Sequence, residues 1–414
     1  MRIAVVGSGI AGLVSAWLLS RRHEVVLFEA ADRPGGHTHT HDVDIDGRRY
    51  AVDTGFIVFN PEHYPLLTRW FAELGVASRA TTMSFSVQDA RSGLEYNAGS
   101  LDGLFCQRRN LLRPRFLRMV QQILRFYREA PAVLNDGTPL QTLGEYLERH
   151  HYGEDFRDLH LVPMASALWS SPASQILKFP MRHLVRFLAN HQMLQATGRS
   201  PWRVVEGGSR TYVRALRAKW RVDERLSCAV TGVHREAIGV RVEHAHGSET
   251  FERIVLACHS DQALALLADA SDAERAVLGA MTYQGNEVVL HTDASLLPRN
   301  RKAWAAWNAH VPAAPGAECS VSYCMNILQG IDAPRPLVVS LNRSVDIDPE
   351  NVLWRGRYDH PLQTAVSAAA QARKGDIQGR RGTWFAGAYW GYGFHEDGMR
   401  SGVEVANALG VAWP

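Results

Sequence analysis

The first thirty residues carry the pattern that most constrains the fold. An apolar strand, RIAVV at residues 2–6, leads into GSGIAG, in which Gly7, Gly9 and Gly12 have the spacing GxGxxG. A helical pattern follows, and a second apolar strand ends at Glu29, 20 residues after Gly9. The segment thus contains every part of a dinucleotide-binding unit: a strand, a glycine-rich turn, a helix, and a second strand with an acidic end. It therefore predicts a dinucleotide site rather than an isolated glycine-rich turn.

Each residue of this unit has a physical role. Gly7 permits a tight turn, Gly9 lets a pyrophosphate approach the backbone, and Gly12 lets the helix pack on the strand. Unpaired amides at the helix N-terminus attract the phosphate charge. The Glu29 carboxylate accepts hydrogen bonds from ribose hydroxyls and disfavours the 2′-phosphate of NADP. The residues expected around the diphosphate are Gly7, Ser8, Gly9, Ala11 and Gly12.

The stretch RPGGHTHTHD places three histidines at alternating positions. In an extended chain, His37, His39 and His41 would point to one face. The outer two would then lie about 13 Å apart at about 3.3 Å of rise per residue. That separation is too large for both to bind one ion, since zinc–nitrogen bonds are about 2 Å long. We therefore expect no metal site here.

From this stretch onward the sequence resembles the flavin amine oxidase superfamily, including its phytoene-desaturase-like and protoporphyrinogen-oxidase-like relatives. The signatures GGHT, VDTGFIVFN and GYGFHEDGMRSG are most similar to those of bacterial predicted NAD/FAD-binding proteins in that superfamily. The resemblance implies FAD as the cofactor and a flavin-diphosphate loop after the ribose-binding glutamate. One departure is His37, where many relatives keep an arginine. The loop contacts that the resemblance implies are Arg33, Gly35, Gly36, His37 and Thr38.

The C-terminal stretch TWFAGAYWGYGFHEDGMRSGVEVANALG reads as a strand, a glycine-rich loop and a helix. The resemblance implies that the helix presents backbone amides to the flavin, and we assign these to Gly398 and Met399. A helix N-terminus at this place stabilises negative charge on the flavin. Gly387 is a further implied contact. The next residue, Ala388, replaces the acidic residue that relatives usually carry.

The order of these motifs predicts an α/β protein with two domains. The first is a Rossmann-like FAD-binding domain of the glutathione-reductase type, and the second is an α+β substrate domain. Val230 follows a mid-chain glycine turn and stands where such flavoproteins place a backbone contact to adenine. We expect a discontinuous FAD-binding domain, with residues 61–203 and 266–375 in the substrate domain and residues 1–60, 204–265 and 376–414 in the FAD-binding domain.

Charge and cysteine content narrow the classes of function. Lys plus Arg number 45 and Asp plus Glu number 42, an excess too small to indicate nucleic-acid binding. The five scattered cysteines contain no CxxC pair, which favours reduced thiols in the cytosol. No segment offers the roughly 18 uninterrupted apolar residues of a spanning helix. We therefore expect a soluble, cytoplasmic protein.

Two segments of the expected substrate domain leave alternatives open. Residues 104–129 hold seven arginines against one acid, Glu129, with apolar residues between them. Such a segment can contact the inner face of an anionic membrane, or it can be a surface helix with solvated arginines; Pro114 should break it in two. Residues 167–194 are apolar and aromatic and form either ordinary core or the wall of an apolar pocket.

FAD supplies hydride chemistry, which the protein directs by placing a substrate C–H bond against the flavin. Many amine oxidases of the superfamily have a lysine near the flavin, on a strand like NEVVLHTD, where this chain offers Asn286 and Glu287. Desaturation of an unsaturated fatty acyl or related lipid chain fits better, and kinship with the bacterial subgroup implies it. Amine oxidation, a non-redox isomerisation and a flavin-binding scaffold remain alternatives. Candidate catalytic residues are His395, Glu396 and Tyr389.

Overall fold

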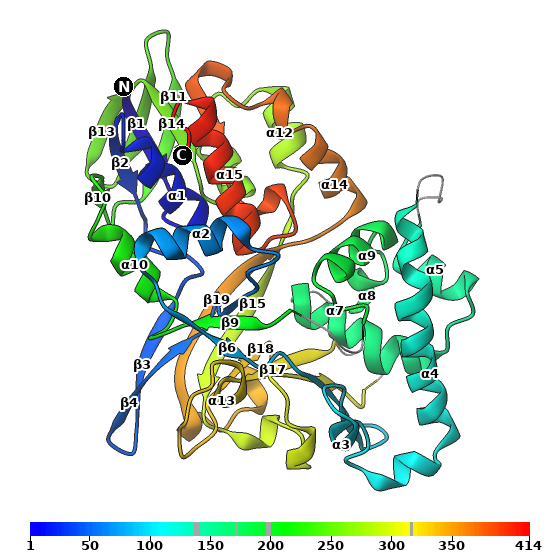
Figure 1. Ribbon diagram of the computed structural model, residues 1–414. Helices are drawn as coiled ribbons and strands as arrows, with labels where there is room; N and C mark the ends of the chain where they lie inside the picture. The colour runs from blue at the N-terminus through cyan, green and yellow to red at the C-terminus, as the bar shows by residue number, and fades with distance from the viewer. Residues whose placement is uncertain (136–140, 170–172, 196–199, 315–317) are drawn as a thin grey trace.

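The first domain is built on a five-stranded parallel sheet with the order β10-β2-β1-β14-β20. The structure is a computed structural model that describes residues 1–135, 141–169, 173–195, 200–314 and 318–414. Strands from the start, middle and end of the chain lie side by side in this sheet (Figure 1). They are β1 (Arg2–Val6), β2 (Glu24–Phe28), β10 (Asp223–Arg225), β14 (Arg253–Leu256) and β20 (Thr383–Phe385).

Both faces of the parallel sheet are covered, which is why its strands are continuous apolar runs. One face packs against α1 (Ile10–Leu19), α2 (Pro65–Leu74), α10 (Arg210–Arg217) and α15 (His395–Ala408). The other packs against an antiparallel sheet of β11 (Val230–Arg235), β12 (Val240–His244) and β13 (Gly247–Phe251). It also packs against α11 (Ser260–Leu266), α12 (Asp272–Leu278) and α14 (Ala365–Ala372).

The second domain contains a seven-stranded mixed sheet with the order β19-β15-β18-β17-β16-β7-β8. Its long strands β15 and β19 run antiparallel and lead up to the first domain (Figure 1). Only the pair β16 and β7 is parallel among the described strands of this sheet. The strands are β7 (Phe85–Asp89), β8 (Leu94–Asn97), β15 (Tyr283–His291), β16 (Trp307–Val311), β17 (Ser320–Cys324), β18 (Val338–Leu341) and β19 (Val352–Pro361).

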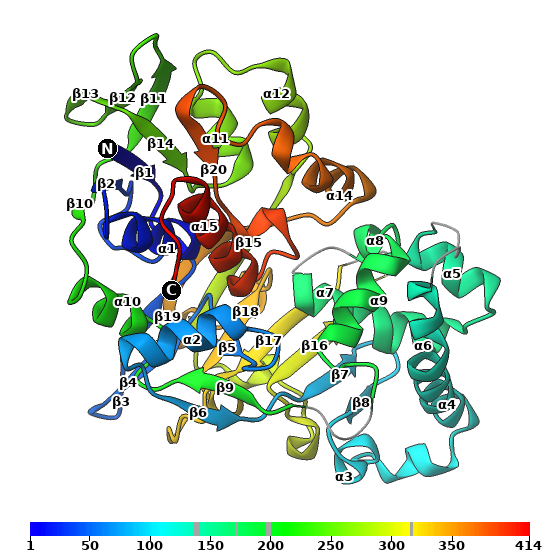
Figure 2. The same cartoon turned by 45° about the horizontal axis from the view of Figure 1, so that its top comes forward.

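Helices form a separate layer at the side of the second domain, away from the parallel sheet (Figure 2). Aromatic and aliphatic side chains on their inner faces make one core with β7, β8 and β16. The helices are α3 (Leu101–Leu104), α4 (Pro114–Glu129), α5 (Leu143–Arg149), α6 (Glu154–Phe156), α7 (Val162–Trp169), α8 (Ala173–Ile176) and α9 (Met181–Asn190). A further short helix, α13 (Met325–Leu328), follows β17.

Two small sheets join the domains. The hairpin of β3 (Thr40–Ile45) and β4 (Arg48–Asp53) begins directly after the predicted diphosphate loop. The second small sheet has the order β5-β9-β6, from β5 (Val58–Phe59), β6 (Ser78–Thr81) and β9 (Trp202–Val205). The connection between them carries the chain past the N-terminus of α15, so residues 53–60 contribute to the space beside that helix.

The predicted α/β fold with two domains is confirmed. The predicted break at Pro114 is also confirmed, because α4 begins at that residue after a 3₁₀ turn at Arg108–Leu112. No helix in the described part of the chain is long and apolar enough to cross a membrane. Within the described ranges, no group of three or more His, Cys, Asp or Glu side chains is placed to hold a metal ion.

Candidate functional site

The turn between β1 and α1 forms an open cradle. Gly7 has φ +97°, which a residue with a side chain rarely adopts. A Cβ on Gly12 would lie 1.9 Å from the Gly7 carbonyl oxygen, whereas a Cβ on Gly9 would meet no atom within 4 Å. Gly9 is the N-cap of α1, and no side chain caps that helix. The backbone N–H groups in the first turn of α1, which includes Ala11, are therefore available to an anion.

The loop after β2 closes the other side of this cradle. Gly36 has φ +57°, and a Cβ there would lie 3.1 Å from the Gly9 Cα. Gly35 N–H donates to the Ser8 carbonyl oxygen over 3.0 Å. The Arg33 guanidinium donates to the carbonyl oxygens of Gly36 and Thr38, both over 3.1 Å, so it braces its own loop. The Gly36 backbone thus lies close to Gly9, beside the open space at the first turn of α1.

Glu29 lies at the end of β2, beside the cradle. One carboxylate oxygen accepts from the Ser8 N–H over 2.8 Å and from the Ser8 hydroxyl, and the other accepts from the Ala31 N–H over 2.9 Å. A carboxylate offers about four acceptor positions, so three protein donors leave capacity for a ribose hydroxyl. The Cys228 N–H donates to the Glu29 carbonyl oxygen over 2.8 Å. This bond brings the start of β11, at Val230, to the same edge of the site.

The N-terminus of α15 supplies the other end of the candidate site. Its position depends on Gly398, where a Cβ would lie 2.6 Å from the Ile10 Cγ2. Gly387, at the end of β20, donates its N–H to the Ser401 hydroxyl over 3.1 Å. These contacts hold the start of α15 against α1, and therefore close to the diphosphate cradle.

α15 begins at His395, three residues before the start at Gly398 that the resemblance implies. The Gly398 N–H donates to the Phe394 carbonyl oxygen over 3.1 Å, and Met399 is fully buried inside the helix. The helix begins earlier than predicted because the Asp397 carboxylate accepts from the N–H groups of Tyr392 and Phe394. The first amides of α15, those of His395 and Glu396, precede the intrahelical pairs. Their N–H groups therefore have no acceptor within the helix.

Among the candidate catalytic residues, His395 has the most direct place in the site. Its ring stacks on Phe56 with centroids 3.6 Å apart. Its Nε2 lies 3.1 Å from the Thr38 hydroxyl and 3.2 Å from the Tyr212 hydroxyl. Burial lowers the pKa of His395 to about 3. A neutral imidazole that joins three segments of chain can order the site, but it is a poor base at neutral pH.

We expect His395→Gln to keep flavin reduction within about tenfold of the wild-type rate at pH 7, since a base with a pKa of about 3 contributes little there. Unfolding should raise the pKa of His395 from about 3 toward 6.5. Between these values the unfolded state binds more protons, so the free energy of unfolding falls as pH drops, by up to about 1.4 kcal/mol per pH unit. Urea unfolding at several pH values should show a shallower acid dependence for the variant.

The control for this prediction is His246→Gln, on the exposed turn between β12 and β13. This variant should leave both the reduction rate and the acid dependence unchanged. A loss of more than about 100-fold in rate for His395→Gln, with an altered pH profile, would instead assign the base role to His395.

The other two candidates are placed differently. The Glu396 carboxylate accepts from the backbone N–H groups of Leu66 and Leu67 over 3.0 and 3.1 Å, at the first turn of α2. Burial raises the pKa of Glu396. Tyr389 packs in the core cluster on the far face of the parallel sheet, where burial raises its pKa well above the usual value. No described residue bonds to its hydroxyl.

The structure also brings together a histidine cluster that no local sequence pattern predicts. The His37 ring lies with its centroid 4.9 Å from Tyr358, 5.4 Å from His360 and 5.8 Å from His259. Burial and the neighbouring histidines hold the pKa of His37 well below its usual value. Asn286 Nδ2 lies 3.1 Å from the His360 Nδ1. These residues come from four distant segments, so no local pattern could have grouped them.

His39 and His41 share one face of the hairpin, as predicted, but not with His37. Their centroids lie 3.9 Å apart, and both rings pack on Trp354. Burial lowers the pKa of His39 to about 3 and that of His41 to about 4. The three histidines therefore divide between the predicted diphosphate loop, which holds His37, and an aromatic contact with β19, which His39 and His41 make.

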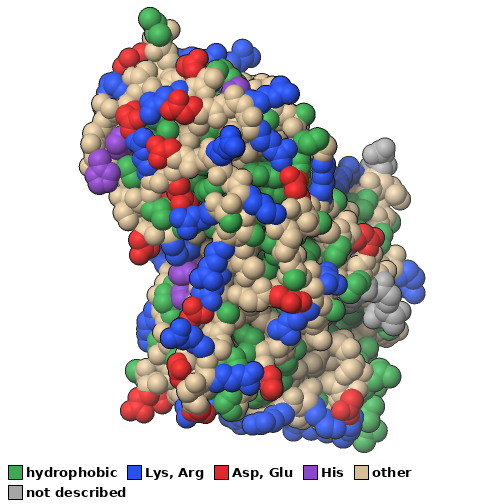
Figure 3. Space-filling model, turned by 60° about the vertical axis from the view of Figure 1, so that its left-hand side comes forward, with side chains coloured by type: hydrophobic (Ala, Val, Ile, Leu, Met, Phe, Trp, Pro, Cys, Tyr) green, Lys and Arg blue, Asp and Glu red, His purple; other side chains and the backbone are tan. Residues whose placement is uncertain are grey.

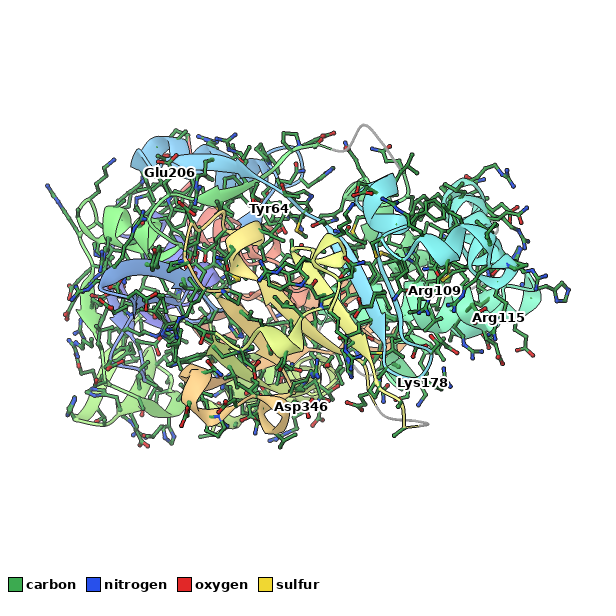
Figure 4. All side chains as sticks on the ribbon, turned by 90° about the horizontal axis from the view of Figure 1, so that it is seen from below. Tyr64, Arg109, Arg115, Lys178, Glu206 and Asp346 are labelled. Atoms are coloured by element: carbon green, nitrogen blue, oxygen red, sulfur yellow. The ribbon has the colours of Figure 1, made fainter. Side chains whose placement is uncertain are left out.

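A cavity of about 290 Å³ lies beside the N-terminus of α15. The start of α2, the end of α9 and the loop before α15 form its walls, and Tyr64 marks its position near the middle of the molecule (Figure 4). Both aromatic rings and polar or charged groups line it. Its lining residues are Glu62, His63, Tyr64, Ala189, Asn190, His191, Gln192, Tyr392, Phe394, Glu396, Asp397 and Arg400.

Comparisons with known proteins agree with this geometry. Residues 10–322 match the family model of flavin containing amine oxidoreductases. Cyclohexylamine oxidase from Brevibacterium oxydans has the same fold, with 16% identity, a TM-score of 0.69, and coverage of 99% of this chain and 98% of that one. A fatty acid isomerase from P. acnes that produces CLA has 15% identity, a TM-score of 0.64 and the same coverage.

A curated relative matches over a shorter stretch. Tryptophan 2-monooxygenase of Pseudomonas savastanoi is 35% identical over 82 residues. That match covers 19% of this chain and 14% of the relative.

Proposed function

Since the chain belongs to the family of flavin containing amine oxidoreductases, we propose that it uses its FAD to take a hydride from an apolar substrate. The membership confirms the superfamily that the motifs predicted, and flavin is the family's cofactor. The substrate that we propose is an unsaturated fatty acyl or related lipid chain, which the reaction desaturates. Bound FAD would supply the hydride acceptor, and the side chains of this protein would position the acyl chain and exclude water.

The observation that carries this proposal is the aromatic wall next to the start of α15. Phe394 directly precedes the helix and stacks on Phe187 of α9 with centroids 4.9 Å apart. Trp169 of α7 lies 6.5 Å from Phe394, and His191 lies 5.9 Å from it. Burial lowers the pKa of His191 to about 4. Phe394 and His191 line the cavity, and Phe187 and Trp169 pack behind them in the core. These four side chains carry no charge at neutral pH and offer apolar contacts to a hydrocarbon chain.

The strand that enters the site from the second domain supports the same choice. Asn286 is fully buried on β15 and bonds to His360 and Asn342, whereas Glu287 is exposed. The resemblance places a lysine of many amine oxidases in this region. The four lysines of this chain lie elsewhere. Lys302 and Lys374 form ion pairs, Lys219 donates to main-chain carbonyl oxygens, and Lys178 is exposed.

Anaerobic spectroscopy of the purified flavoprotein tests the proposal. A monounsaturated phospholipid or free fatty acid should bleach the flavin absorbance, while a polyamine should not. Bleaching by the polyamine alone would contradict the lipid substrate. A shifted double bond in the recovered lipid, without net flavin reduction, would favour an isomerase, and no response to any ligand would favour a flavin-binding scaffold.

A further inference from the structure

The helical layer of the second domain exposes an unusual set of leucines. Ten large hydrophobic residues are exposed in the described part of the chain, and five of them lie between residues 101 and 124. Leu101 and Leu112 are the most exposed of the five, at 77% and 86%. Leu117 and Leu124 lie on α4, away from its buried face of Phe116, Met119, Ile123 and Phe126. Exposed apolar side chains concentrated on one segment of the chain indicate an interaction surface.

Basic side chains surround these leucines. Residues 101–128 hold seven arginines and one acid, Asp102, which pairs with Arg108 and Lys302. Arg115 pairs with Asp155, and Arg125 and Arg128 pair with Glu129. Within the described residues, no ion pair engages Arg109, Arg113 or Arg118. A net positive surface thus accompanies the exposed leucines.

The shape of this surface is convex. The turn between α3 and α4 lies at the lower edge of the molecule (Figure 1). Figure 3 shows that Lys and Arg side chains and hydrophobic side chains lie along the lower edge of the face it draws. Arg109 and Arg115 lie at one end of the molecule, well apart from Tyr64 of the cavity (Figure 4). An edge of this kind offers no groove to a partner helix. It does suit a flat membrane surface, into which the leucines can insert while the arginines stay at the level of the headgroups.

We propose that residues 101–124 dock this protein on the surface of an anionic phospholipid membrane. Leu101, Leu111 and Leu112 enter the boundary between headgroups and acyl chains, and Arg109, Arg113 and Arg118 meet the phosphates. This combination is that of an interfacial amphipathic segment. Single-stranded nucleic acid would need exposed aromatic rings for stacking, and none of the exposed large hydrophobic residues of the described chain is aromatic. The docking does not depend on the substrate that we propose.

Co-sedimentation of the FAD-loaded protein with vesicles tests the docking. We expect binding to equimolar phosphatidylglycerol and phosphatidylcholine, and weak binding to phosphatidylcholine alone. Leu111→Ser with Leu112→Ser should weaken binding at least about tenfold, because each inserted leucine contributes a large apolar area. Arg109→Glu, Arg113→Glu and Arg118→Glu together should weaken it by about 100-fold or more, and added salt should weaken the wild type.

Matched controls come from other exposed positions. Ile238→Ser and Val345→Ser remove side chains that are 90% and 93% exposed elsewhere, and Arg48→Glu with Arg49→Glu reverses charges on the β3–β4 hairpin. All controls should bind vesicles like the wild type, and every variant should keep its flavin and its thermal midpoint. Absence of wild-type binding to anionic vesicles would overturn the proposal. The proposal would also be overturned if the leucine and arginine variants bound anionic vesicles as tightly as the wild type. The same holds if these variants changed only the self-association of the protein and not its binding to vesicles.

Discussion

Replacing Gly9 with valine is expected to leave the protein folded and to abolish its retention of FAD. A Cβ at Gly9 meets no protein atom within 4 Å, and the backbone there has φ −63°, which valine adopts readily. The open space lies at the N-terminus of α1, where the diphosphate is expected. The side chain should therefore weaken FAD binding by about 100-fold or more, because it displaces the diphosphate from the helix amides.

The measurement is the ratio of flavin to protein after purification, together with the circular dichroism of the apoprotein. Gly375→Val is the matched control, because Gly375 is exposed and a Cβ there also meets no atom within 4 Å. Gly12→Ala should behave differently, since its Cβ would lie 1.9 Å from a carbonyl oxygen and the turn itself must shift. A Gly9→Val protein that retains stoichiometric FAD would show that the cradle does not hold the diphosphate.

Glu396→Ala should destabilise the fold by about 2–4 kcal/mol, because two backbone N–H groups at the start of α2 lose a charged acceptor in the interior. Glu396 is 5% exposed, so water cannot readily replace the carboxylate. The contact joins α15 to α2, because Glu396 lies 330 residues after Leu66 and 329 residues after Leu67 in the chain. Loss of stability should appear in urea unfolding monitored by circular dichroism.

Two further variants separate this structural role from catalysis. Glu404→Ala, at an exposed position of α15 that pairs with Lys374, should change stability by less than about 1 kcal/mol. Glu396→Gln keeps one oxygen acceptor and should lose only part of the stability, with flavin reduction near the wild-type rate. If Glu396→Gln instead abolishes reduction and leaves unfolding unchanged, the carboxylate acts on the substrate.

The parts of this fold that could be predicted from sequence are those set by neighbouring residues. The turn at Gly7 and Gly12 follows from backbone geometry, and the start of α4 follows from Pro114, which has no N–H to donate within a helix. α15 begins three residues before the start that the resemblance implies, because Asp397 caps the helix from its third position. A local sequence pattern therefore predicts the start of a helix only where a single residue, such as Pro114, determines it.

Long-range contacts account for what the sequence could not predict. The tie between Glu396 and α2 depends on two segments more than 300 residues apart. The cluster around His37 depends on β14, β15 and β19 meeting at the domain boundary, and His259 and His360 have no periodicity that would place them there. His37 stands out in the sequence because many relatives keep an arginine there, but its neutral neighbours His259 and His360 are brought together only by the fold.

The most direct test of the proposed chemistry is the mass of the lipid after a single anaerobic turnover. The FAD-loaded protein, in excess over a monounsaturated acyl substrate, should return a product lighter by two hydrogens for each flavin reduced. A product of unchanged mass would contradict desaturation, whether or not its double bond has moved.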